Sequence, residues 1–169
     1  MPEITFADFV GDSLPTLTRY ACALTGERHA AEDLVQDTLV KLSGAWRRVR
    51  HDGNPIGYAR AVMFRTYVSR WRALRRRPVL HEYQEQPAPD DQYAQVEVRD
   101  ALRRALAELP RLQRAVLVLG YLDDLADEEI AELLERRPAT IRSLRHRGLL
   151  TLRERLEPHA MRKVTHGAC

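Results

Sequence analysis

Residues 125–156 contain two short amphipathic helical patterns separated by a four-residue break. Apolar side chains recur at the spacing that a helix-turn-helix needs for its inward-facing positions: Ile130, Ala131, Leu134, Ile141 and Leu144. Ala131 is small at the point where two such helices cross closely. Pro138 suits the first position of the second helix, because its φ is already helical and an N–H there has no partner within the helix. This segment therefore predicts a helix-turn-helix.

The second of these helices is rich in arginine. Its candidate residues for contact with nucleic acid are Arg137, Thr140, Arg142, Ser143, Arg145, His146 and Arg147. The second helix of a helix-turn-helix enters the major groove, where its outward side chains reach base edges. We expect Arg142 and Ser143 near base edges, and Arg145 and Arg147 nearer phosphates. The alternative is a helical hairpin whose basic face is only solvated.

Two residues depart from the usual pattern of this motif. Glu135 stands in the turn where glycine is common, so it must either adopt a left-handed backbone or shift the turn. Arg137 stands where a capping serine or threonine is usual, which lowers the stability of the helix start by roughly 1 kcal/mol.

The charge of the chain is unevenly distributed. Of its 27 basic residues 25 are arginine, whose planar fork suits phosphate and guanine, although a GC-rich genome also explains much of this bias. Two arginine-rich blocks, 47–77 and 136–155, flank an acidic segment that contains prolines. The predicted organisation is a helical domain over 1–78, an acidic linker over 79–95, a second helical domain over 96–158 and a short tail over 159–169.

The N-terminal part also follows a helical spacing, and no segment alternates with the period of a strand. The predicted fold class is therefore all-α, with two small helical domains. Pro15 interrupts the first pattern, where we expect a kink or a fresh helix start. The next helix is expected from Ala30 to about Arg47, and a third after Pro55. Opposite its apolar side, the second helix carries a polar stripe: Asp33, Gln36, Asp37 and Lys41.

Several classes of protein are disfavoured. The N-terminus lacks the pattern of a signal peptide, and no apolar run approaches the length of a membrane span, so we expect a cytoplasmic protein. Cys22 and Cys169 lie far apart, no CxxC is present, and the histidines have no metal-binding spacing. We therefore expect no metal, no cofactor and no enzymatic activity.

Three segments resemble a known family. The residues AEDLVQD (31–37), preceded by Leu24-Thr25-Gly26, are similar to a conserved region of group IV sigma factors, the extracytoplasmic-function group, of bacterial RNA polymerase. Residues 58–77 resemble the helix that follows it, and 106–134 resemble the opening of the C-terminal domain. The likeness covers roughly 6–156, and the arginine-rich, tryptophan-containing third helix resembles the SigE-like actinobacterial branch.

This resemblance implies an alternative sigma factor that binds core RNA polymerase and directs promoter recognition and opening. The stripe Asp33, Gln36, Asp37 and Lys41 would dock on the clamp helices of the largest subunit, and the C-terminal domain on the flap of the second-largest subunit. The helix-turn-helix would read the minus-thirty-five element. The third helix would bind and melt the minus-ten element of promoter DNA, through Arg60, Phe64, Arg65, Tyr67, Arg70, Trp71, Arg72 and Arg75.

Other interpretations stay open from the residues alone. The stripe can be a solvated helix face, and the aromatic residues of the third helix can be core. Arg65 stands where the family commonly has asparagine, and Ser143-Leu144-Arg145 replaces its usual Ser-Arg-Leu order. The resemblance also makes an anti-sigma protein a plausible partner. The second candidate function is a helix-turn-helix regulator that does not act through core polymerase.

Overall fold

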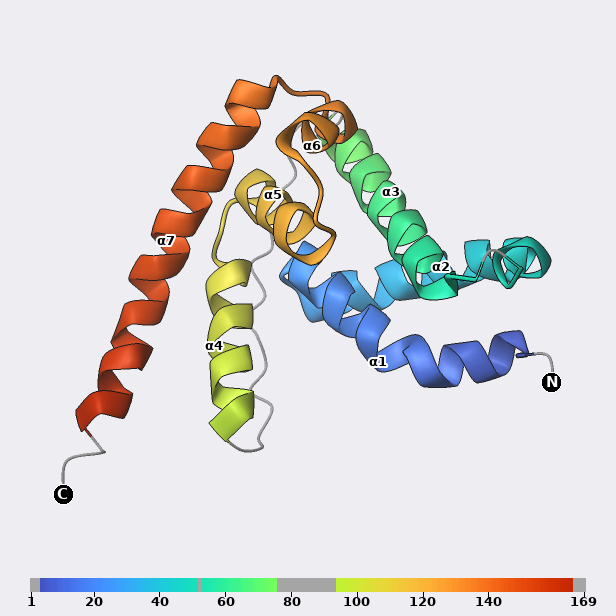
Figure 1. Cartoon of the computed structure of the whole chain (residues 1–169), viewed down its shortest axis with the longest axis horizontal. Coiled ribbons are helices and arrows are strands. Elements are labelled where there is room, and N and C mark those ends of the chain that lie inside the picture. Colours follow the sequence, from blue (N-terminus) through green and yellow to red (C-terminus); the bar gives the residue numbers. More distant parts are fainter. Residues whose placement is uncertain (1–3, 52, 76–93, 166–169) are drawn as a thin grey trace. The chain divides into compact units, whose positions relative to one another are not determined.

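A computed structural model describes residues 4–51, 53–75 and 94–165. Within these residues the chain forms seven α-helices and no strand (Figure 1), which confirms the predicted all-α fold. The chain divides into two compact units, Met1–Glu85 and Gln86–Cys169. The predicted acidic linker lies outside the described residues, except that helix α4 already begins at Ala94.

The first unit packs three helices against one another: α1 Phe6–Thr25, α2 Arg28–Val49 and α3 Pro55–Arg75. Thr5 and Asp8 begin α1 as a capping box, and Gly26 ends it with a left-handed φ of 72°. The helix runs through Pro15 without the fresh start that was one of our two expectations. The core is formed by side chains that are at most 1% exposed: Leu17, Leu24, Leu34, Leu42, Met63 and Val49.

An aromatic cluster closes one end of this core. The ring of Trp46 lies 5.4 Å from that of Phe6 and 5.0 Å from that of Phe9, measured between centroids. These contacts join the end of α2 to the start of α1.

The second unit contains four helices: α4 Ala94–Ala107, α5 Arg111–Leu122, α6 Asp127–Leu134 and α7 Pro138–Thr165. Helix α7 packs against the other three and extends beyond the expected domain end at residue 158 (Figure 1). Helices α6 and α7 form the predicted helix-turn-helix. All five predicted inward residues are buried, from 0% exposed at Ile130 and Ile141 to 7% at Leu144.

A buried arginine donates hydrogen bonds to carbonyl groups at the end of α4. Arg114 is only 4% exposed, and its Nη1 donates to the carbonyl oxygens of Leu106, Ala107 and Leu109 at 3.5, 3.0 and 3.4 Å. The last carbonyls of a helix have no partner within it. Arg114 therefore supplies a hydrogen-bond donor to the carbonyl groups where α4 ends, including that of the buried Leu109.

The turn between α6 and α7 has a left-handed residue that is not glycine. Glu135 adopts φ 53° and ψ 50°, so the turn keeps its left-handed residue, and the clash between the Cβ atom and the backbone carbonyl strains the backbone of Glu135. Arg137 precedes α7, and its carbonyl accepts from the N–H groups of Thr140 and Ile141 at 2.9 and 3.2 Å. Pro138 is the first helical residue, as predicted.

Replacing Glu135 by glycine is expected to raise the free energy of unfolding by about 1 kcal/mol, because glycine adopts the left-handed region without the Cβ clash. Urea denaturation followed by circular dichroism measures this change. The matched control is Glu132→Gly in the exposed interior of α6, which should lower stability by about 1 kcal/mol. A loss of stability in both variants would contradict the strain argument.

Candidate functional site

The predicted stripe on α2 lies on the surface. Asp33, Gln36, Asp37 and Lys41 are all exposed, while Leu34 and Thr38 beside them are buried. Residues spaced by four lie on one side of a helix, so Asp33, Asp37 and Lys41 form a single row. Together with Gln36 beside it, this α2 row presents two carboxylates, an amide and an ammonium group, and the exposed Val40 is its apolar neighbour.

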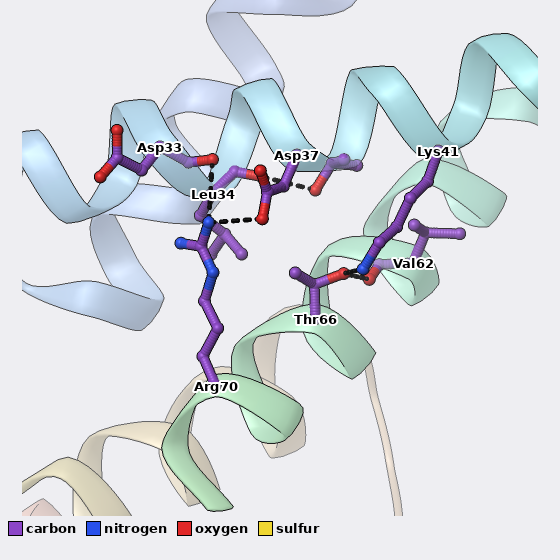
Figure 2. A network of polar contacts seen from close by, with 8 residues as sticks. Asp33, Leu34, Asp37, Lys41, Val62, Thr66 and Arg70 are labelled. Carbon is purple, nitrogen blue, oxygen red and sulfur yellow. Dashed lines mark hydrogen bonds and ion pairs between the residues drawn. The ribbon is translucent and has the colours of Figure 1, made fainter. Parts of the chain in front are cut away.

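Residues of α3 reach across to this row (Figure 2). One Nη of Arg70 donates to a carboxylate oxygen of Asp37 at 2.5 Å and approaches the carbonyl oxygen of Asp33 at 3.4 Å. The Nζ of Lys41 donates to the hydroxyl of Thr66 at 2.9 Å. The structure therefore pairs Arg70, which we predicted as a promoter contact, with Asp37, which we predicted as a polymerase contact.

The other predicted residues of α3 differ in exposure. Arg65 is exposed, whereas Arg60 is half-buried with its guanidinium carbon 4.6 Å from the ring centroid of Tyr20. Phe64 is 5% exposed and belongs to the core, so it presents no face on which a base could stack. Core packing is the better interpretation of Phe64. Three of the remaining members are half-buried: Tyr67, Trp71 and Arg72. The side chain of Arg75 lies outside the part that the structure describes.

The outward side of α7 presents most of the predicted reading residues. Those exposed are Arg137, Arg142, Ser143, His146 and Arg147, and Thr140 is half-buried. A guanidinium nitrogen of Arg142 lies 3.7 Å from a carboxylate oxygen of Glu128, with both side chains more than half exposed. This pair is solvated and weak, so Arg142 is available to a stronger partner.

Arg145 does not lie with them. It follows Ile141 by four positions, so it shares the inward side of α7, and its Nε and Nη2 donate to one carboxylate oxygen of Asp127 at 3.0 and 2.5 Å. Both side chains are only 21% exposed. Our expectation that Arg145 lies near phosphates does not match this position. The changed Leu144-Arg145 order turns the guanidinium toward the protein.

Two acidic residues at the start of α6 were missed by the sequence reasoning. Asp127 and Glu128 contact Arg145 and Arg142, respectively. These residues could have been expected at the start of a helix, because the helix dipole favours carboxylates in the first turn. The pairing of α6 with α7 across the motif could have been inferred from the buried positions of Ile130 and Ile141.

The described residues contain neither a candidate metal site nor a candidate membrane span. No group of His, Cys, Asp or Glu side chains among them could hold a metal ion, and the half-buried Cys22 is not part of a disulfide. No described helix is long and apolar enough to cross a membrane.

Comparison with known proteins identifies the family. A family model described as Sigma-70 region 2 matches residues 9–77, and one described as Sigma-70, region 4 matches residues 99–152. The RNA polymerase sigma-E factor of Streptomyces avermitilis is 32% identical over 91% of this chain and 86% of its own length. The ECF RNA polymerase sigma factor SigL of Mycobacterium tuberculosis is 33% identical over 83% of this chain and 82% of its own.

The chain belongs to the extracytoplasmic-function group of sigma factors. A solved structure of a sigma factor is also similar: the sigma factor RpoE of Bartonella quintana, in complex with the anti-sigma factor NepR, has a TM-score of 0.60 at 25% identity. The alignment covers 90% of this sigma factor and 96% of that chain. The region 2 match contains α1 to α3 from Phe9 onward, and the region 4 match contains the helix-turn-helix.

Proposed function

We propose that this sigma factor binds core RNA polymerase, directs it to promoter DNA and assists strand opening, while the polymerase carries out RNA synthesis in the cytoplasm. One observation supports this most strongly. The polar α2 row and the basic outward face of α7 occur in one chain, within matches to sigma region 2 and region 4. A helix-turn-helix regulator that acts without polymerase does not need the polar α2 row. The regulator is therefore not the favoured function.

The α2 row is the proposed docking surface for the clamp helices of the largest polymerase subunit. Exposed carboxylates of Asp33 and Asp37, with the amide of Gln36, suit basic side chains on a partner helix. In the free chain Asp37 is paired with Arg70. Docking through Asp37 would therefore exchange one arginine partner for another.

The α3 surface is the proposed minus-ten contact. Arg65 is the exposed arginine among the α3 side chains that the structure describes, and the half-buried Tyr67 and Trp71 would have to become more exposed to stack on an unpaired base. Arg65 only donates hydrogen bonds, whereas asparagine both donates and accepts. We therefore propose a base preference at this position that differs from that of relatives with asparagine.

The α7 face is the proposed minus-thirty-five reader. Replacing Arg142 by alanine is expected to cost about 2 kcal/mol of affinity on the preferred element, and far less on unrelated sequences. Fluorescence anisotropy of the holoenzyme with duplexes of each kind measures this difference. Arg153→Ala, which removes an exposed arginine farther along α7, is the control. Equal losses on all duplexes would make Arg142 a phosphate contact.

Run-off transcription tests the function as a whole. Purified core polymerase is supplied with genomic fragments, with and without the sigma factor, and promoter-dependent transcripts should appear only when it is present. Absence of any such product, despite copurification with core, would refute the proposal. An anti-sigma protein is a plausible further partner, because the similar Bartonella sigma factor was solved in complex with one.

A further inference from the structure

The guanidinium of Arg145 lies where three helices meet. Besides its two hydrogen bonds to Asp127 of α6, its central carbon lies 5.5 Å from the ring centroid of Tyr121 in α5. Hydrogen bonds between ionised groups are stronger than neutral ones, and partial burial reduces their screening by solvent. Arg145 therefore joins α7 to both α5 and α6.

Gly120 leaves the space that this arrangement needs. A Cβ atom at Gly120 would lie 2.2 Å from Nη1 and 2.7 Å from Nη2 of Arg145, so any larger residue would displace the guanidinium. The φ of Gly120 is not left-handed, so its backbone does not require glycine. A Cβ atom at this position can be accommodated only if the guanidinium of Arg145 moves away, so a larger residue here would disturb the contact between Arg145 and Asp127.

We propose that Asp127 and Arg145 are a positioning pair that sets which side of α7 faces DNA, and so determine base specificity without touching the bases. This inference rests on the proposed role of α7 as the minus-thirty-five reader. Rotation of α7 about its axis would move Arg142 and Ser143 together away from a base edge. The pair opposes that rotation, because its donors are fixed by the planar fork of Arg145 and its acceptor by the first turn of α6.

The pair should persist on DNA. Asp127 is the first residue of α6, where the helix dipole stabilises a carboxylate. A phosphate that captured Arg145 would have to replace two hydrogen bonds and leave the partly buried Asp127 without its cation. The exposed residues Arg142 and Arg147 can meet DNA without such a loss.

The test selects preferred minus-thirty-five sequences from a random DNA pool with reconstituted holoenzyme. The variants are Asp127→Asn, Arg145→Ala and Gly120→Ala, and the control Glu132→Gln neutralises an exposed acid of the same helix. Gly120→Ala keeps the net charge and favours helix, so it separates loss of the pair from loss of folding. Circular dichroism checks the helicity of each variant.

We expect the three variants to select the same relaxed sequence pattern, and to bind the wild-type element about tenfold more weakly. Removing an acid beside DNA should otherwise strengthen binding, so a loss in Asp127→Asn has the opposite sign to a simple charge effect. Glu132→Gln should keep the wild-type pattern. The double variant Asp127→Asn, Arg145→Ala should be no worse than either single variant.

Two results would overturn the inference. Arg145→Ala could weaken binding to every duplex alike and reduce the slope of log affinity against log salt by about 1, which is the signature of a phosphate contact. Asp127→Asn could instead bind as well as or better than wild type with an unchanged pattern. If the wild-type holoenzyme selects no element at all, the proposed function itself fails, which is a different result from either.

Discussion

Replacing Asp33 and Asp37 together by lysine is expected to weaken binding to core RNA polymerase by about a hundredfold, equivalent to about 2.7 kcal/mol. The two side chains are exposed and one turn apart on α2. Reversal of both charges would place like charges opposite the basic partner proposed for the clamp helices. Competition with wild-type sigma factor for fluorescently labelled core measures the change.

The control reverses two exposed acids elsewhere, Asp12→Lys and Glu132→Lys, which alters the net charge by the same amount. That variant should compete nearly as well as wild type, and both variants should keep their helicity. Equal weakening by the two double variants would reduce the effect to net charge. Full competition by the Asp33, Asp37 variant would make the row a solvated helix face.

Replacing Arg114 by methionine is expected to destabilise the second unit by about 3 kcal/mol, because three carbonyl groups at the end of α4 lose a buried, charged donor. Methionine occupies a similar length without a polar group, so the change removes the hydrogen bonds more than the packing. Amide hydrogen exchange in α4 and α5 at increasing urea concentrations measures this loss locally.

Arg111→Met is the matched control, since Arg111 is an exposed arginine in the first turn of α5, the helix that contains Arg114. It should change exchange by less than about 0.5 kcal/mol, as surface substitutions generally do. Exchange in the first unit should be unaffected by either variant. If amide hydrogen exchange in α4 were unchanged in Arg114→Met, water would be able to replace the guanidinium with little loss of stability.

Hydrophobic spacing was sufficient to predict the helix-turn-helix. Ile130, Leu134 and Ile141 are buried as expected, because a period of 3.6 residues determines which side of a helix meets its neighbour. The same spacing identified the exposed α2 row around Asp37. At Glu135 the sequence alone left two possibilities open, a left-handed backbone or a shifted turn. The packing of α6 on α7 determines that Glu135 adopts the left-handed backbone.

Pairings between helices were harder to predict. Arg145 and Arg114 are arginines at inward positions, and a pattern based on hydrophobicity assigns such residues to the surface. Their burial depends on a carboxylate or on carbonyls supplied by another helix. Phe64 was misassigned for the reverse reason, since an aromatic residue among arginines resembles a stacking surface until the packing of α3 is known. The roles of the docking and promoter residues remain predictions.

The contact between Arg70 and Asp37 has a thermodynamic consequence. Its cation belongs to the proposed promoter surface and its anion to the proposed docking surface, so a ligand at either surface must first break the same ion pair. Two ligands that share one such cost bind with positive cooperativity, and the linkage is reciprocal. Off the polymerase, the sigma factor would bind promoter DNA with one fewer arginine. Partner and promoter would then each raise the affinity for the other, with no movement of either helix.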